Sequence, residues 1–245
     1  MAGRTLALIY GSVCYVLFLV TFVQAIWFVR TMGEKRAASG GWQTALLIDA
    51  ALLAVFALQH SIMARQWFKR QWTKLVPQPV ERSTFVLFTV GALQLLMRFW
   101  QPLPGVIWEV QNQAGRVVLE AGMWLGFGIV LIATFLINHF DLFGLNQVWL
   151  YFTGKPYDPP KFRTPMFYKM VRHPLYLGFS IAFWSTPVMT TDHLIFAIMT
   201  VAYMLVAIQL EERDLVSIHG EQYQVYRSGV SMIVPWPKGR SKAQS

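Results

Sequence analysis

The sequence predicts an all-α, polytopic integral membrane protein, a helical bundle of about five to six transmembrane helices in a single domain spanning residues 1–245. Of its 245 residues, 55% are hydrophobic and only 13% are charged, and the apolar residues form long runs. The net charge of +9 resides between these runs. The positive-inside rule explains that placement, which argues against nucleic acid as a partner. The single cysteine excludes a disulfide framework.

The first part of the chain contains four apolar runs, which predict transmembrane helices over residues 5–29, 43–64, 83–97 and 117–137. Residues 65–79 mix basic and aromatic side chains, which predicts a helix lying at the headgroup level. We expect Ser83 or Thr84 to cap the third span. Gly122, Gly126 and Gly128 predict that the fourth span approaches another helix closely.

The last part of the chain predicts a helical hairpin. Residues 140–169 are expected to form a long loop, either a lid or a plain connector. The apolar runs 175–190 and 194–210 follow, separated by a polar turn at 191–193, and Pro174 suits the first turn of the first run. Sixteen of the 21 lysines and arginines lie in the N-terminal segment, the loops after the second and fourth spans, and the C-terminal tail, which the spans place on one side of the membrane. Both termini are therefore expected in the cytoplasm.

Several ionisable residues are expected to meet at the cytoplasmic rim. Because a helix rises 1.5 Å per residue, His60 lies about 8 Å inside the boundary marked by Arg65. The other expected members are His139, Asp141, Arg172, His173, Glu211, Glu212 and Arg213. Each also has a structural interpretation, such as an interhelical hydrogen bond, a helix cap or a contact with lipid headgroups. No two histidines have the spacing of metal ligands on a helix, so no metal is expected.

Three C-terminal stretches carry a resemblance to a known family. Residues 172–178 read Arg-His-Pro-Leu-Tyr-Leu-Gly, and Glu211-Glu212 and the 220–226 stretch Gly-Glu-Gln-Tyr-Gln-Val-Tyr follow. This pattern resembles the C-terminal signature of isoprenylcysteine carboxyl methyltransferases. The resemblance implies that S-adenosylmethionine binds here, in a cytoplasmic pocket beside a membrane-embedded acceptor site. The implied cofactor contacts are Tyr168, Arg172, His173, Pro174, Leu175, Tyr176, Gly178, Glu211, Glu212, Tyr223 and Tyr226.

The N-terminal stretches resemble a narrower group. Residues 59–65, 81–84 and 138–144 are similar to those of bacterial methanethiol S-methyltransferases, which form dimethyl sulfide, with the NnrU-like membrane proteins as a neighbouring group. The resemblance implies a small thiol substrate and a multi-pass protein of the bacterial inner membrane. It also divides the chain into acceptor-side helices, residues 1–139, and a cofactor-binding loop, hairpin and tail, residues 140–245.

Methylation of a thiol predicts a base or a cation near the acceptor, because the thiolate is the reactive nucleophile. We expect His60, His139 and Asp141 to be catalytic, with His139 as the first candidate and Asp141 orienting it. The alternatives are another small thiol, a prenylcysteine-type carboxylate, a non-catalytic NnrU-like membrane factor, or a nicotinamide-dependent reductase. The sequence does not predict the oligomeric state.

Overall fold

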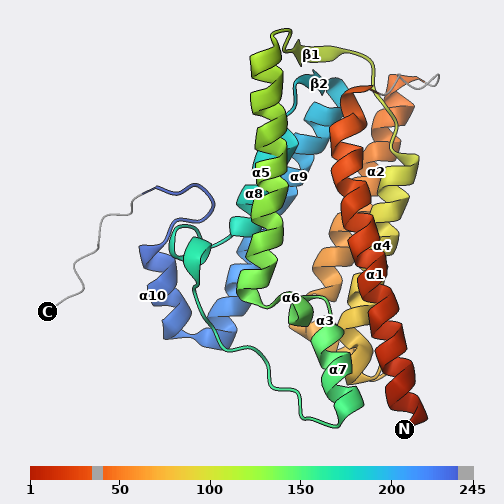
Figure 1. The fold of residues 1–245 in the computed structure, drawn as a ribbon, viewed down its shortest axis with the longest axis vertical. Helices are drawn as coiled ribbons and strands as arrows, with labels where there is room; N and C mark the ends of the chain where they lie inside the picture. The colour runs from red at the N-terminus through yellow and green to blue at the C-terminus, as the bar shows by residue number, and fades with distance from the viewer. Residues whose placement is uncertain (35–40, 237–245) are drawn as a thin grey trace, which may run out of the picture.

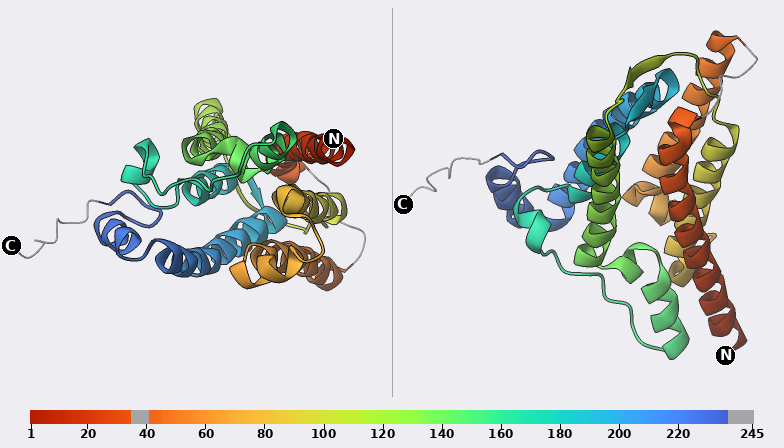
Figure 2. Two further views of the ribbon diagram at one scale, coloured as in Figure 1. Left: turned by 90° about the horizontal axis from the view of Figure 1, so that it is seen from below. Right: turned by 45° about the horizontal axis from the view of Figure 1, so that its top comes forward.

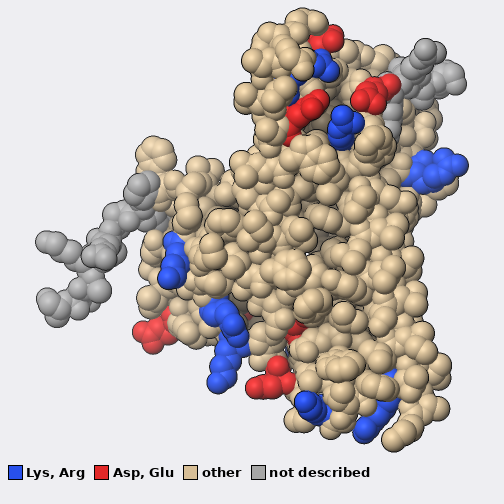
Figure 3. All heavy atoms as spheres, in the orientation of Figure 1, with Lys and Arg blue, Asp and Glu red and all other residues tan. Residues whose placement is uncertain are grey.

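The computed structural model describes residues 1–34 and 41–236, and five long helices build its bundle (Figure 1). Among these residues, five helices are long and apolar enough to cross a membrane. They are α1 (Ala2–Thr31), α2 (Trp42–Met63), α4 (Gln78–Phe99), α5 (Gln113–Ile137) and α9 (Thr191–His219). Charged side chains on the visible face gather mainly toward the two ends, with a broad, largely uncharged band between them (Figure 3). The predicted all-α polytopic bundle is confirmed.

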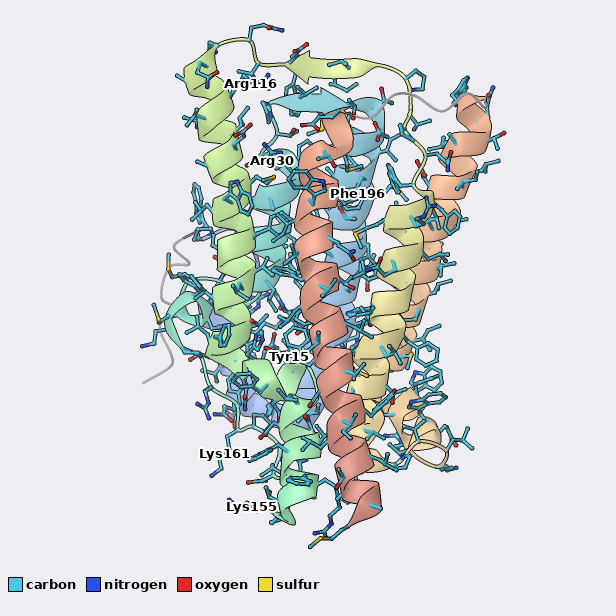
Figure 4. The ribbon with its side chains drawn as sticks, turned by 45° about the vertical axis from the view of Figure 1, so that its right-hand side comes forward. Tyr15, Arg30, Arg116, Lys155, Lys161 and Phe196 are labelled. Atoms are coloured by element: carbon cyan, nitrogen blue, oxygen red, sulfur yellow. The ribbon has the colours of Figure 1, made fainter. Side chains whose placement is uncertain are left out.

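Most of the short helices lie at the end of the bundle that holds the N-terminus (Figures 1 and 2). They are α3 (Gln66–Trp72), α6 (His139–Leu142), α7 (Leu145–Thr153) and α10 (Glu221–Gly229). Helix α3 confirms the predicted helix within 65–79. Lys155 and Lys161 project at this end, whereas Arg30 and Arg116 lie at the other (Figure 4). The basic residues at positions 35, 36, 238, 240 and 242, which entered the charge count, lie outside the described residues.

The opposite end is closed by a small antiparallel sheet. It pairs β1 (Val106–Glu109) with β2 (Val188–Thr190), and Val106 is opposite Thr190. The short 3-10 turn η1 (Met32–Glu34) lies close to it. The sequence did not predict this sheet, because strands of three or four residues show too little alternation to stand out. The sheet ties the α4–α5 connection to the start of α9.

The third span starts earlier than predicted. Helix α4 begins at Gln78, and Pro79 occupies its first turn, where a proline costs no hydrogen bond. Ser83 and Thr84 are therefore buried inside the helix, and their predicted capping role is wrong.

The C-terminal part also differs from the prediction. Residues 140–169 are not one loop, because they contain α6 from Phe140 onward, α7 and the 3-10 turn η2 (Met166–Lys169), leaving residues 155–165 without regular structure. The predicted polar turn at 191–193 is the first turn of α9. Helix α8 (Pro174–Trp184) stops short, and the chain reaches the sheet through an extended segment. The hairpin therefore consists of a short helix, a strand and a long helix.

Close packing of α5 against α8 holds the start of the hairpin. A Cβ atom added to Gly126 would lie 2.6 Å from the Gly178 carbonyl oxygen and 2.5 Å from the Ala182 nitrogen. One added to Gly122 would lie 2.8 Å from the side-chain oxygen of Ser185, just after α8, whereas Gly128 faces open space. The prediction of close approach is confirmed for Gly122 and Gly126 and is wrong for Gly128.

We predict that Gly126→Val destabilises the protein by about 1–3 kcal/mol, because the added methyl groups force α5 and α8 apart. Thermal unfolding of the detergent-solubilised protein measures the change. Gly128→Val is the matched control on the same helix and should unfold within a few degrees of the wild type. Equal unfolding temperatures for both variants would contradict the close packing of α5 on α8.

Candidate active site

The start of α8 is held by the C-terminal segment of the chain. The backbone nitrogens of Arg172 and His173 donate to the carbonyl oxygens of Ser231 and Met232, at 2.8 and 3.1 Å. Pro174 is buried at the first helical position, where the sequence placed it. These contacts fix the two polar side chains that precede the helix and turn them toward α9.

Glu212 of α9 is the centre of this cluster. One carboxylate oxygen accepts hydrogen bonds from Arg172 Nε at 2.7 Å and from the His173 ring at 3.0 Å. The other lies 2.9 Å from Nε of Arg227 in α10. The side chain of Glu212 is only 2% exposed. A carboxylate so deeply buried is tolerated because two guanidinium groups and an imidazole satisfy it.

Glu211 lies at the mouth of the same cluster, with its side chain 44% exposed. The Tyr176 hydroxyl donates to it at 3.1 Å, and His173 Nδ1 lies 3.8 Å away. Adjacent residues of a helix point about 100° apart, which separates the buried Glu212 from the accessible Glu211. The structure thus brings together the polar residues of the first two C-terminal stretches, whereas Arg213 is exposed.

Three tyrosines surround the cluster. The Tyr226 hydroxyl donates to the Tyr168 carbonyl oxygen at 2.6 Å. The hydroxyls of Tyr168 and Tyr223 are buried and have no hydrogen-bond partner among the described residues. Burial raises the pKa of Tyr226 to about 12, and burial together with the nearby glutamates raises the pKa of Tyr168 and Tyr223. All three are therefore protonated at neutral pH and can donate hydrogen bonds.

One of the expected cofactor contacts, Gly178, lies on another face of α8. Gly178 packs on α5 and is two residues, or about 200°, from Tyr176 around the helix. Leu175 is half-buried. Because it has no side chain, Gly178 allows α8 to pack closely on α5.

His139 is buried at the junction of α5 and α6, and its ring contacts Tyr15 of α1. Thr134 gives its single proton to a backbone carbonyl, so His139 Nδ1 must donate to it, at 2.8 Å. His139 Nε2 then accepts from the Tyr15 hydroxyl at 2.8 Å. Burial lowers the pKa of His139, which keeps the ring neutral. Both ring nitrogens are thus occupied.

Asp141 does not orient His139 as expected. Its carboxylate accepts hydrogen bonds from Asn146 and from the Tyr157 hydroxyl, both at 3.0 Å. Burial and the Asp141 charge raise the pKa of Tyr157 to about 12. Asp141 therefore anchors the segment that follows α7.

His60 presents a free lone pair. Thr89 gives its proton to the Phe85 carbonyl oxygen, so His60 Nδ1 donates to Thr89 at 3.3 Å. Nε2 is then the acceptor nitrogen, and it has no hydrogen-bond partner among the described residues. The ring stacks on Phe56 and contacts Phe85.

The end of α2 that carries His60 is joined to the helix that holds Glu211 and Glu212 by contacts that the sequence analysis missed. The hydroxyls of Ser61 and Tyr203 lie 3.1 Å apart, and Arg65 pairs with Asp214 at 2.8 Å. Tyr203, Glu211 and Asp214 follow a helical period along α9, so they share one face. That period was the signal available for finding Tyr203.

The described part of the chain, residues 1–34 and 41–236, offers no obvious metal site. These residues contain no group of three or more histidine, cysteine, aspartate or glutamate side chains arranged to hold a metal ion.

Curated relatives match nearly the whole chain. The methanethiol S-methyltransferase of Crocosphaera subtropica is 53% identical over 238 residues, which cover 96% of this chain and 93% of that protein. The methanethiol S-methyltransferase of Mycobacterium tuberculosis is 52% identical over 240 residues, 96% of this chain and 98% of that protein. The chain belongs to the methanethiol S-methyltransferase family.

A more distant similarity to Nurim of Xenopus laevis reaches 31% identity over 185 residues, 71% of this chain and 63% of Nurim. No family model matches the chain, and no solved structure matches it. Membership of the methanethiol S-methyltransferase family therefore rests on whole-chain similarity to curated proteins.

We predict that Glu212→Gln destabilises this member of the methanethiol S-methyltransferase family by about 3–5 kcal/mol, because it leaves the buried Arg172 guanidinium without its counter-charge. Glu211→Gln is the matched control, and its half-exposed side chain should cost less than about 1 kcal/mol. Thermal unfolding in nanodiscs measures both. A Glu212→Gln protein as stable as Glu211→Gln would show that the buried pair does not hold α8, α9 and α10 together.

Proposed function

We propose that this protein transfers the methyl group of S-adenosylmethionine to the sulfur of methanethiol and releases dimethyl sulfide. The observation that carries the proposal is the buried cluster of Arg172, His173 and Glu212, with Glu211 accessible at its mouth. The family membership supports both the reaction and the acceptor.

The residues of the cluster fit S-adenosylmethionine. The donor carries an ammonium group, ribose hydroxyls and a positive sulfonium, which an accessible carboxylate such as Glu211 stabilises. Two buried tyrosine hydroxyls, on Tyr168 and Tyr223, lack partners among the described residues and are the kind of donor that a polar ligand satisfies. Tyr176 is fixed on Glu211 and orients it.

We propose His60 as the base on the acceptor side. Its Nε2 lone pair is available, whereas that of His139 is bound to Tyr15. The end of α2 is also joined to the helix that holds Glu211 and Glu212 through Ser61 and Tyr203. His139 and Asp141 then act indirectly, by holding the wall between α1, α5 and α7.

The thiol proton passes to His60 Nε2 and from there to water. The thiolate sulfur uses its lone pair to form a bond to the methyl carbon, while the bond from that carbon to the sulfonium sulfur breaks and leaves its electron pair there. The products are dimethyl sulfide, S-adenosylhomocysteine and one proton. Because the charges of thiolate and sulfonium cancel, an apolar site that holds the reactants in line favours the reaction.

The proposal includes the placement of the protein. The basic helix α3 and the side chains of Lys155 and Lys161 lie at the end that holds the N-terminus (Figures 1 and 4), which the positive-inside rule assigns to the cytoplasmic side of the bacterial inner membrane. The donor cluster then faces the cytoplasmic supply of S-adenosylmethionine. Residues 1–139 supply the acceptor side and residues 140–245 the donor side.

We predict that the purified protein, given S-adenosylmethionine and methanethiol, forms dimethyl sulfide, measured by headspace gas chromatography. His60→Gln should lower kcat by roughly 10²–10⁴-fold, as expected for loss of general-base catalysis. Its affinity for S-adenosylhomocysteine, measured by calorimetry, should stay unchanged.

The matched donor-side variant is Glu211→Gln, which should lower the affinity for S-adenosylhomocysteine. If the wild type binds S-adenosylhomocysteine but a panel of small thiols and a prenylcysteine shows that another acceptor is methylated, the methanethiol assignment is wrong. Absence of both binding and product would favour a non-catalytic membrane factor.

A further inference from the structure

Arg82 is a cation near His60, on the side of the bundle that we assign to the methyl acceptor. It takes no part in the cluster around Glu212. It lies on α4 in the series Arg82, Phe85 and Thr89, whose spacing places the three side chains on one face of the helix. His60 of α2 faces this series, because it hydrogen-bonds Thr89 and its ring centre lies 5.0 Å from that of Phe85. Arg82 contacts the same ring, with its guanidinium carbon 4.8 Å from the ring centre. Arg82 and His60 thus share Phe85 as a common neighbour.

The guanidinium group is fixed but forms no direct ion pair among the described residues. Arg82 Nε donates to the Leu142 carbonyl oxygen at 2.6 Å, which pins it between α4 and α6. No carboxylate lies within 4.0 Å of it among the described residues. Asp141, the acidic group of the neighbouring helix, is already held by Asn146 and Tyr157. The two terminal nitrogens of Arg82 therefore remain available to an anion.

The surroundings are apolar on the side of His60. Phe85 belongs to a buried cluster with Met63, Val86 and Val90, and Phe143 packs against it. An aromatic wall beside a single guanidinium suits an anion that is small and otherwise apolar. Methanethiolate, a methyl group bonded to a charged sulfur, has this character.

We propose that Arg82 binds the methyl acceptor as its thiolate, with the sulfur held by the Arg82 guanidinium and the methyl group against Phe85. This assignment rests on the proposed function and adds a catalytic residue to it. His60 Nε2 takes the thiol proton, and Arg82 stabilises the negative charge left on sulfur until the carbon–sulfur bond has formed. A fixed cation favours ionisation of a thiol that is otherwise neutral at pH 7.

Other charged groups lie near Arg82 and His60, and a pH profile must distinguish their effect from that of Arg82. Glu81, Asp141 and Tyr157 act electrostatically on the guanidinium, and Arg65 and Arg82 act on His60. Lys69 of α3 also interacts electrostatically with Arg82. Because arginine stays charged throughout the accessible pH range, removal of Arg82 alters the ionisation of the bound thiol without adding a titrating group of its own.

The test compares Arg82→Gln and Arg82→Lys with the wild type in nanodiscs. Arg82→Gln should lower kcat/KM for methanethiol at pH 7 by roughly ten- to a hundredfold, the effect of losing one charge-assisted contact. The deficit should shrink as pH rises, because the thiol then ionises in solution. Arg82→Lys should fall between the two. Arg98→Gln, at the exposed far end of the same helix, is the control and should match the wild type.

A second measurement does not depend on turnover. Methanethiol added to the wild type with S-adenosylhomocysteine at pH 7 should show the ultraviolet absorbance of a thiolate, and Arg82→Gln should not. A neutral bound thiol in the wild type overturns the proposal even if Arg82→Gln fails to fold.

The remaining outcomes are also decisive. If Arg82→Gln loses affinity for S-adenosylhomocysteine while KM for methanethiol is unchanged, Arg82 binds the donor and the proposal is wrong. A rate loss that does not change with pH likewise contradicts it. A wild type that forms no dimethyl sulfide overturns the proposed function itself, which separates that failure from failure of the assignment of Arg82.

Discussion

The arrangement of α8, α9 and α10 depends on the ion pairs of one buried carboxylate, that of Glu212. It contacts Arg172 and His173 at the start of α8 and Arg227 of α10, and Arg172 in turn binds the carbonyl oxygens of Arg227 and Val230. A charge removed from water is stable only where its partners are in place, so this contact forces three separate segments into one arrangement. The residues that we propose to face the methyl donor, Glu211 and the tyrosines, take their positions from this contact.

Helix α9 joins the N-terminal and C-terminal parts of the chain, because it contacts both α2 and the start of α8. One face of this helix carries Glu212 into the buried cluster, and the neighbouring face presents Tyr203, Glu211 and Asp214 toward α2 and the mouth of the site. Near His60, two stretches that are distant in sequence are joined by hydrogen bonds. The side chains of residues 82 and 83 of α4 donate to the carbonyl oxygens of residues 142 and 144. The stretches that resembled known methyltransferases are therefore contact surfaces as well as sources of polar groups.

Hydropathy was sufficient to predict the long spans, and local motifs predicted the start of α8 and the cluster of Arg172, His173 and Glu212. What the sequence could not provide were pairings between distant residues. Arg227 and Tyr203 were missed because only folding brings them to their partners, and the partners of Asp141 were misjudged because neighbours in sequence at a helix end need not touch. Helix α7 was missed because a nine-residue helix carries too short a periodic signal.

The pairing of residues 171–173 with residues 231 and 232 has a consequence for the order in which the protein is built. The Arg172 guanidinium donates to the carbonyl oxygen of Val230, which lies 58 residues further along the chain. The first helices can insert and pack while translation continues, but the start of α8 lacks these partners until the segment after α10 has left the ribosome and returned to α8. The proposed binding site for the methyl donor is thus completed only after this C-terminal segment has been made.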